Sequence, residues 1–451
     1  MQSIIFTLII VEILCRYILS NNRSVSRLNF LLISGMIQSL MMYPITKFEF
    51  LELKKAGIDY IGAPFETRIG ILFPTFIALF ILFNRVKRKR WYWKDIKVPF
   101  GAILIALTYS FVTPFNHSST ASIIVFLLFF QIFIVIYACK EQVDKDVILL
   151  SLYDGLSILI TIEFIISFSY VIMHIDYFQQ FFLGNQTKEL EWIREGTNVR
   201  RAYGTTYQPN RLAGLCAYAT MFFLPCYLFR FKKISSLLLT FMSFATIVFS
   251  QSRSALVATV VSIVLVVLMY YYKRHKFSLA KIVTLAVITS LLGLSLLNLD
   301  IISDMLFKSN LEEMEEARMF HYILAYGILN DTSFMGVGLN SHVFYMYDQL
   351  LHYGFASFYY TRPIHSVHLS ILAETGIIGF LFWIYFLISR FSRISTLPLS
   401  RMNSPILCFA FVGMLIVVLF HGMTDCLYLH YQYLLILMLV GAFYGIKPSC
   451  T

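Results

Sequence analysis

RPIHSVHLSILAETGIIGFLFWIYFL, residues 362–387, is the stretch that decides the fold class. From residue 367 onward it supplies about 20 mostly apolar positions, the length that an α-helix needs to cross a bilayer. His365, His368 and Glu374 lie at the entrance of this run. Because a carboxylate is costly in hydrocarbon unless it faces a partner or a cavity, the stretch predicts a membrane span whose first turns have a polar role.

The composition of the chain points the same way. Hydrophobic residues make up 58% of the 451 positions and charged residues 14%, unlike a soluble globular domain. The formal net charge of +11 comes from short basic clusters between apolar runs, which membrane orientation explains better than nucleic-acid binding. The seven cysteines show no C-x-x-C pair, so neither a disulfide framework nor a metal site is expected. We therefore expect an integral membrane protein with no nucleic-acid partner.

Apolar runs recur along the whole chain, and about thirteen are long enough to span a membrane, with one more or one fewer left open. They are centred on residues 2–19, 28–45, 68–84, 98–115, 120–139, 147–173, 210–229, 234–250, 255–272, 278–298, 367–389, 404–422 and 428–446. No charged segment with a cleavage site precedes the first run, which is therefore expected to be a retained span. The sequence predicts an all-α fold, a polytopic helix bundle with about 12–13 transmembrane helices.

The orientation of this bundle follows from lysine and arginine in the short loops. The basic segments are NRVKRKRWYWKDIK (84–97), RFKK (230–233), YKRHK (272–276) and SRFSR (389–393). All four fall on one face if the spans alternate, and that face is predicted to be cytoplasmic. The C-terminus is then inside and the N-terminus outside.

The same alternation places the two longest connections, residues 174–209 and 299–366, outside the cytoplasm. Residues 317–330, ARMFHYILAYGILN, have helical periodicity, so short helices lying on the outer surface are expected there. We divide the chain into an N-terminal transmembrane bundle, residues 1–173, and a core, residues 174–451, that carries both loops.

Polar clusters then gather at the predicted outer face. VRRAYGTTYQPNRLAG (199–214) contains Arg201, and Asn210 is predicted to cap the span that follows. In FSQSRSAL (249–256), Arg253 lies at a tight turn between two hydrophobic helices, where its charge opposes the orientation rule. EEARMFHYILAYGIL (315–329) places Arg318 near the start of a loop helix, and the opening stretch is the fourth cluster.

Each cluster also has an ordinary interpretation. A single arginine at a membrane edge can extend to lipid headgroups, and a single histidine can be interfacial. Glu374 can be buried against a neighbouring helix with no link to a reaction. An ordinary role in packing or at the interface is assigned to His321, His342, His352 and His421.

Taken together, the arginines and one histidine suit glycosyl transfer from a lipid-linked donor. Guanidinium groups grip a diphosphate through a planar fork and would stabilise it as it departs. Histidine titrates near neutrality and can take a proton from an attacking sugar hydroxyl. No D-x-D-like metal motif appears at that face, so neither a metal nor another cofactor is expected.

These segments resemble the O-antigen ligase and polymerase superfamily of bacterial surface-polysaccharide assembly. RAYGTTYQPNRLAG resembles its R-x-x-G segment ending in N-x-x-A, and SQSRSAL resembles its S-R-[GS]-A turn. ARMFHYILAYGILNDTSFMGVGLN resembles its R-x-x-x-[WH] helix followed by G-x-G, with the histidine one position earlier in this chain. HSVHLSILAETGIIG resembles its H-[NS]-x-x-L-x-x-L-x-E-x-G-x-x-G segment.

The resemblance implies a GT-C-like membrane glycosyltransferase that moves a glycan from undecaprenyl diphosphate to an acceptor outside the bacterial cytoplasmic membrane, with inversion and without a metal. It assigns Arg253 and Arg318 to the diphosphate, with Arg201 as a further basic position, and His365 as the general base. His368 stands where the family usually has an aromatic residue, so which histidine faces the acceptor stays open, although His365 fits the motif better. Glu374, His368 and Asn210 are assigned supporting roles.

Within the family we favour a polymerase of O-antigen or capsule, which joins repeat units carried on lipid diphosphates and works beside a flippase and a chain-length regulator. The alternative within the family is a ligase that transfers the chain to lipid A core. A lipid-linked oligosaccharide flippase is the alternative from another class. It is disfavoured because a transporter predicts charged or broken helices near the bilayer midplane, whereas polar residues here gather at one face.

Overall fold

The computed structural model describes the main part of the core predicted from the sequence. The described residues are Ile132, Ile136, 145–178, 200–206, 208–275, 311–339, 341–345, 364–402, 404–427 and 431–443. In them the regular structure is helical with no β-strand, and five helices are long and apolar enough to cross a membrane. The prediction of an all-α, polytopic helical membrane protein is thereby confirmed. The total number of spans and the runs predicted at 2–19, 28–45, 68–84, 98–115 and 278–298, with almost all of 120–139, lie outside the described residues.

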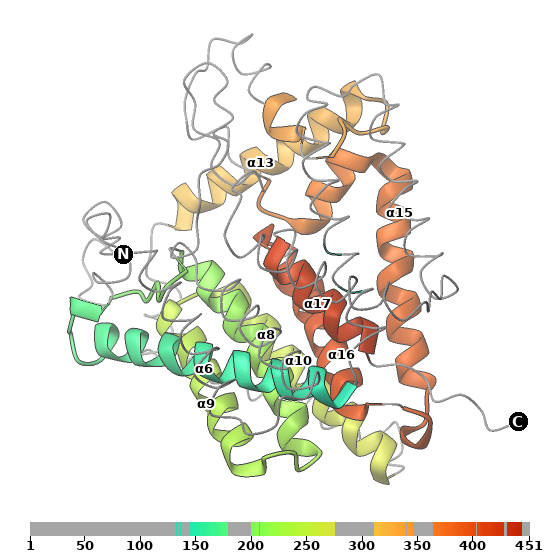
Figure 1. Cartoon of the computed structure of the whole chain (residues 1–451). Coiled ribbons are helices and arrows are strands. Elements are labelled where there is room, and N and C mark those ends of the chain that lie inside the picture. The colour runs from blue at the N-terminus through green and yellow to red at the C-terminus, as the bar shows by residue number, and fades with distance from the viewer. Residues whose placement is uncertain are drawn as a thin grey trace, which may run out of the picture.

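The centre of the bundle is α8 (Pro209–Leu228), which is buried on nearly every side. It packs against α9 (Lys233–Ser250), α10 (Arg253–His275) and α16 (Pro405–His421), as Figure 1 shows. A helix that is hydrophobic all round belongs in such a position. Because α8 is central, the loop that precedes it is held at one end of the bundle.

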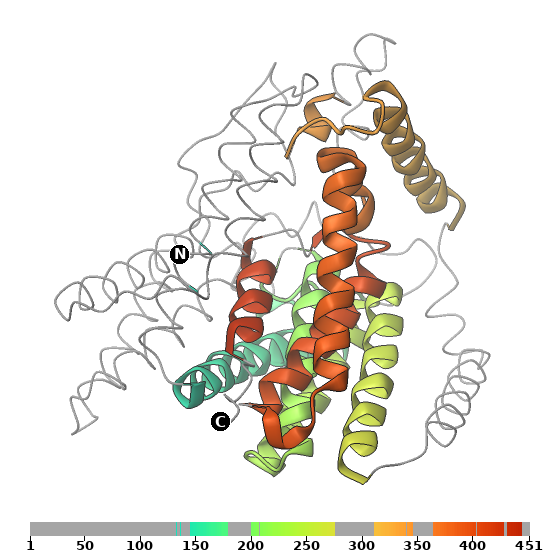
Figure 2. The ribbon, with the colours of Figure 1, turned by 90° about the vertical axis from the view of Figure 1, so that its right-hand side faces the viewer.

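Three further helices surround this centre. α6 (Lys145–Val171) crosses α8 and α9, and α17 (Tyr431–Phe443) packs on α16 (Figure 1). α15 (Val367–Thr396) stands beside α16, and a short 3₁₀ helix, Leu399–Arg401, connects the two (Figure 2). The large exposed side chains on α15 are Ile377, Ile378, Leu381, Phe382, Tyr385, Ile388 and Phe391, an apolar face suited to lipid.

α13 (Leu311–Asp331) is the helix expected within the 299–366 connection. It is not among the five candidate spans, and it packs on α15 through Ala325 and Ile328. On its other side Met319, Ile323 and Tyr326 are exposed. The residues that follow α13 run back to α15 and contact it at a kink.

The kink in α15 is at Gly376, whose φ of +65° is favourable only for glycine. A Cβ there would lie 2.4 Å from the Phe334 carbonyl oxygen, and a Cβ on Gly336 would lie 2.5 Å from the Gly376 nitrogen. Three backbone hydrogen bonds join the two segments: Val337 N to Ala373 O (3.0 Å), Gly338 N to Glu374 O (2.9 Å) and Ile377 N to Phe334 O (3.0 Å). The G-x-G and E-x-G patterns of the sequence therefore form one interlocked unit.

Candidate functional site

Arg253 lies at a tight turn between α9 and α10, as predicted. The turn is made by Gln251, which has a left-handed backbone (φ +53°) and donates its N–H to Val248 O at 3.0 Å. α10 begins at Arg253, which is half-buried. The loop before α8 runs along this turn, because Ala202 N donates to Phe249 O at 2.9 Å. The positive N-terminus of α10 and an arginine therefore lie at the same point.

Arg201 joins this turn to the start of α8. Its Nε donates to Ser250 O at 2.8 Å and its Nη2 to Asn210 Oδ1 at 3.2 Å. These bonds make Arg201 a connector between two backbone segments.

The prediction that Asn210 caps the following span is wrong. α8 begins one residue earlier, at Pro209, with Gln208 as its N-cap and no side-chain capping bond. Proline suits the first helical position because its missing N–H would have no helical partner there. Asn210 is therefore in the first turn, and its Nδ2 donates to Asp425 Oδ2 at 2.9 Å.

Glu163 fixes the shape of the same loop from within α6. Its buried carboxylate accepts the Thr205 N–H at 2.9 Å and also bonds the Thr205 hydroxyl. Gly204 has φ +54°, and a Cβ on it would lie 1.9 Å from Glu163 Oε2. Sequence reasoning missed Glu163, although a carboxylate inside the apolar run 147–173 was a usable signal.

The loop of residues 422–427, which we call the bridging loop, connects the other segments of the site. Gly422 O accepts from Val367 N at 2.7 Å and from Ser366 Oγ at 3.3 Å, at the start of α15. Met423 O accepts from the Tyr322 hydroxyl of α13 at 3.4 Å. Asp425, two residues after Met423, accepts from Asn210, which in turn accepts from Arg201. This path of hydrogen bonds runs from the start of α15 to the α9–α10 turn.

The charges around Cys426, in the bridging loop, indicate the same convergence. Burial raises the pKa of its thiol well above the ordinary value. The charge of Asp425 raises it further, that of Arg211 lowers it, and that of Glu374 raises it. Groups from α8 and α15 therefore act on one thiol in the bridging loop.

Arg318 lies in α13, one helical turn before Tyr322. Its side chain lies outside the described residues. Its helix, α13, contacts both the bridging loop and α15.

His365 is half-buried and directly precedes Ser366, the N-cap of α15. The Ser366 hydroxyl accepts the Leu369 N–H at 3.3 Å, which satisfies one of the free amides of the first turn. His365 therefore lies on non-helical backbone immediately before the helix begins.

His368 has both ring nitrogens hydrogen-bonded within the protein. Trp383 Nε1 donates to His368 Nδ1 at 3.1 Å, and since an indole N–H can only donate, Nδ1 must accept. The ring proton is then on Nε2, which donates to Leu419 O of α16 at 3.0 Å. His368 thus ties α16 to the α15 residues on both sides of the kink, and it has no ring nitrogen left for a substrate hydroxyl.

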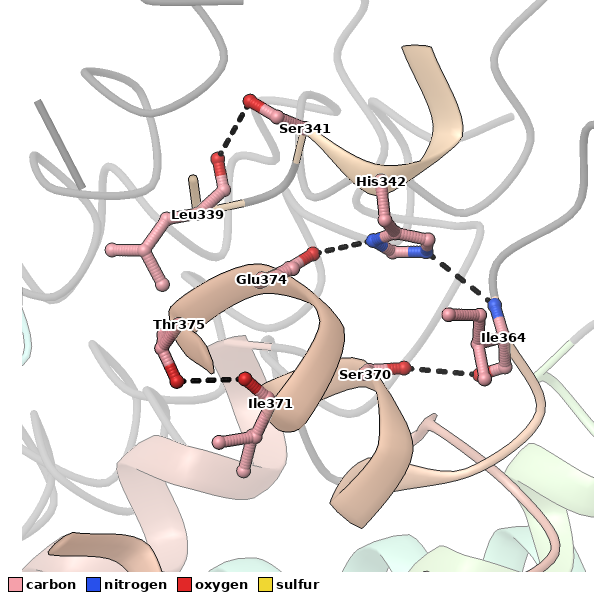
Figure 3. Close-up of polar contacts among 8 residues, drawn as sticks. All are labelled: Leu339, Ser341, His342, Ile364, Ser370, Ile371, Glu374 and Thr375. Atoms are coloured by element: carbon pink, nitrogen blue, oxygen red, sulfur yellow. Dashed lines mark hydrogen bonds and ion pairs between the residues drawn. The ribbon is translucent and has the colours of Figure 1, made fainter. Parts of the chain in front are cut away.

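Glu374 has a partner that was not predicted from the sequence. Its Oε1 lies 2.5 Å from Nδ1 of His342, and both side chains are buried (Figure 3). His342 Nε2 in turn accepts the N–H of Ile364 at 3.4 Å. His342 had been given an ordinary packing role, whereas it connects Glu374 to the residue before His365.

This geometry defines a helical membrane protein whose arginine- and histidine-bearing segments converge at one end of the bundle. The family model described as O-antigen ligase (Wzy_C) matches residues 238–384. No curated protein matches the chain closely enough to count as a relative. The family match supports membership of the chain in the O-antigen ligase and polymerase superfamily, and it confirms the resemblance seen in the sequence.

The matched residues run from α9 into α15. Within them lie Arg253, Arg318, His342, His365, His368 and Glu374, and outside them lie Glu163, Arg201, Asn210 and Asp425. The match supports a function of the ligase or polymerase type, carried out in a membrane on lipid-linked oligosaccharides.

Proposed function

We propose that the chain is a bacterial surface-polysaccharide polymerase that joins lipid-linked repeat units at the outer face of the cytoplasmic membrane. The donor would be an oligosaccharide on undecaprenyl diphosphate and the acceptor a second lipid-linked repeat unit. The observation that supports this most directly is the bridging loop, which connects the turn bearing Arg253 to the segment bearing His365.

In the proposal, Arg253 binds the diphosphate of the donor. A guanidinium offers a planar fork to phosphate oxygens, and the first amides of α10 add the positive end of a helix dipole. Arg318 of α13 supplies a second guanidinium to the same group. Arg201 has a positioning role, because its Nε and Nη2 hold the turn on which Arg253 lies.

His365 is the general base of the proposed reaction. The acceptor hydroxyl oxygen attacks the anomeric carbon of the donor sugar as its proton passes to His365. The bond between that carbon and the diphosphate oxygen breaks, and the lipid diphosphate leaves with the electron pair. Attack from the face opposite the leaving group inverts the anomeric centre. A flippase that delivers the repeat units and a chain-length regulator are the partners of the proposal.

The test is product formation by purified protein in liposomes containing a defined lipid-diphosphate-linked repeat unit. We expect a ladder of products from the wild type and none from Arg253→Ala or His365→Ala at equal protein level and thermal stability. Arg253→Lys should also be impaired, because a point charge does not reproduce the fork.

Two other results would count against the proposal. A single transfer to lipid A core, with no ladder from repeat units alone, would identify a ligase. Full activity of the Arg253→Ala variant would remove the proposed mechanism.

A further inference from the structure

We infer that His342 is a positioning residue for the proposed reaction: its Nε2 holds the Ile364 N–H, and through Ile364 it fixes the backbone from which His365 extends. The inference rests on the proposed function, in which His365 is the base. His342 itself is buried and would touch neither donor nor acceptor.

The first step concerns Ile364, whose two backbone polar groups are both fixed. Its N–H donates to His342 Nε2 at 3.4 Å. Its carbonyl oxygen accepts from Ser366 N at 2.7 Å. It also accepts from the Ser370 hydroxyl at 3.1 Å (Figure 3). Ile364 is fully buried, so water does not replace these bonds. The residue before His365 therefore has a defined peptide orientation on both sides.

The second step concerns the tautomer of His342. A backbone N–H can only donate, so Nε2 must be the unprotonated nitrogen that accepts it. A neutral imidazole then carries its proton on Nδ1, which faces Glu374 Oε1 at 2.5 Å. A carboxylate on one ring nitrogen is the usual device for selecting the tautomer at the other. Glu374 therefore makes Nε2 an acceptor.

The third step concerns the support of this pair. Gly338 N donates to the Glu374 carbonyl at 2.9 Å, and Ser341 N donates to Gly338 O at 3.2 Å. The backbone that carries His342 is thus attached to the backbone that carries Glu374. The close approach of Gly336 to Gly376 makes the attachment rigid. These contacts together hold the His342 imidazole against the Ile364 N–H.

Two substitutions at His342 separate this role from mere packing. The amide of Gln reaches the position of Nε2 and can accept from Ile364 N–H, whereas the amide of Asn reaches the position of Nδ1 and bonds only Glu374. We expect His342→Gln to keep kcat within several-fold of the wild type. His342→Asn should lower kcat about 10–100-fold, the size of effect known for residues that orient a metal-ligating histidine.

KM for the donor should be unchanged in both variants, because the diphosphate contacts are untouched. Glu374→Gln gives a second test, since its carboxamide oxygen still accepts from Nδ1–H. Glu374→Leu offers no acceptor, and its kcat should fall as in His342→Asn while that of Glu374→Gln falls less. The assay is the ladder-forming turnover of liposome-reconstituted protein, with the thermal unfolding midpoint recorded for each variant.

Wild-type kcat in His342→Asn would overturn the inference, as would equal losses of kcat and thermal stability in the Asn and Gln variants. His365→Ala separates these failures from failure of the proposed function. If His365→Ala is inactive while His342→Asn is fully active, only the positioning role is wrong. If His365→Ala is itself active, the proposed role of His365 as the general base is wrong, and the positioning role of His342 falls with it.

Discussion

The two sides of the site are held together in different ways. On the arginine side, formed by the loop before α8 and the α9–α10 turn, charged side chains hold backbone groups: Arg201 binds Ser250 O, and Glu163 binds Thr205 N. On the histidine side, formed by the loop after α13 and the start of α15, backbone binds backbone next to Gly336 and Gly376, and the buried His342–Glu374 pair adds side-chain bonds. Loss of charge at Arg201 or Glu163 should therefore weaken the arginine side, and an added side chain at Gly336 or Gly376 should weaken the histidine side.

The largest expected effect separates the two histidines at the start of α15. His365→Ala should lower turnover by about 100–10,000-fold, the range for loss of a general base. His368→Ala should leave turnover within about tenfold of the wild type and lower thermal stability instead, because it removes the link to Leu419 O and Trp383. Turnover and the unfolding midpoint of both proteins in detergent or liposomes give the comparison. Equal loss of turnover in the two would contradict the separation of roles.

The close contact between Gly336 and Gly376 on the histidine side can be broken without changing any charge. Gly376→Ala should destabilise the protein by at least about 1–3 kcal/mol, because alanine is strained at φ +65° and its Cβ would meet Phe334 O. Gly327→Ala is the matched control, since a Cβ there has nothing within 4 Å and alanine favours a helix. We expect a lower unfolding midpoint for the first variant and an unchanged or higher one for the second. Equal midpoints would show that the contact between the two glycine segments is not rigid.

Substitutions in the hydrogen-bonded charges of the arginine side should have a smaller effect on turnover and stability. Arg201→Ala removes two hydrogen bonds from a charged donor, and we expect a loss of about 1–3 kcal/mol in stability together with reduced turnover. Asp425→Asn keeps one acceptor oxygen, for Asn210, loses the one that accepts the Leu427 N–H, and should be milder. Thermal unfolding and turnover of the two variants test this order. If Asp425→Asn is the more damaging, the charge of Asp425 matters beyond its bond to Asn210.

The smallest effect is on the reactivity of Cys426, measured in a variant in which it is the only cysteine. Burial and the charge of Asp425 raise the pKa of its thiol, so the reactive thiolate should be scarce at neutral pH and the alkylation rate should rise with pH beyond the range of an ordinary thiol. Asp425→Asn should lower that pKa and speed alkylation at pH 8, and Arg211→Gln should slow it. Alkylation rates across pH check each sign. Alkylation rates that are unchanged by both substitutions would contradict the placement of these charges near the thiol.

Apolar run length was enough to predict the long helices of the described core other than α13, which was predicted from its helical periodicity. The run predicted at 210–229 is α8 at Pro209–Leu228, and the run at 234–250 is α9 at Lys233–Ser250. Length works because a lipid-embedded segment must satisfy its own backbone and must cross a fixed thickness. The kink of α15 was not predicted, because Gly376 reaches its left-handed conformation only against the loop after α13.

The segments that carry the arginines and histidines of the site could also be predicted, but most of the hydrogen-bond partners could not. Glu163 is 42 positions from Thr205, and Asn210 is 215 positions from Asp425. No periodicity relates residues so far apart, so their pairing depends on how the helices pack. His342 shows the same limit: its neighbourhood suggests an ordinary histidine, and its role follows only from the loop that brings it to Glu374.

The central claim is that Arg253 and His365 act on one transfer event in one site. A double-mutant cycle on turnover by liposome-reconstituted protein tests this most directly, using Arg253→Ala, His365→Ala and the double variant. Residues that act as a unit are strongly non-additive, so we predict a loss of about 100-fold or more in each single variant and a double variant no slower than the slower single. Wild-type turnover in either single variant, or losses that multiply in the double, would contradict the claim.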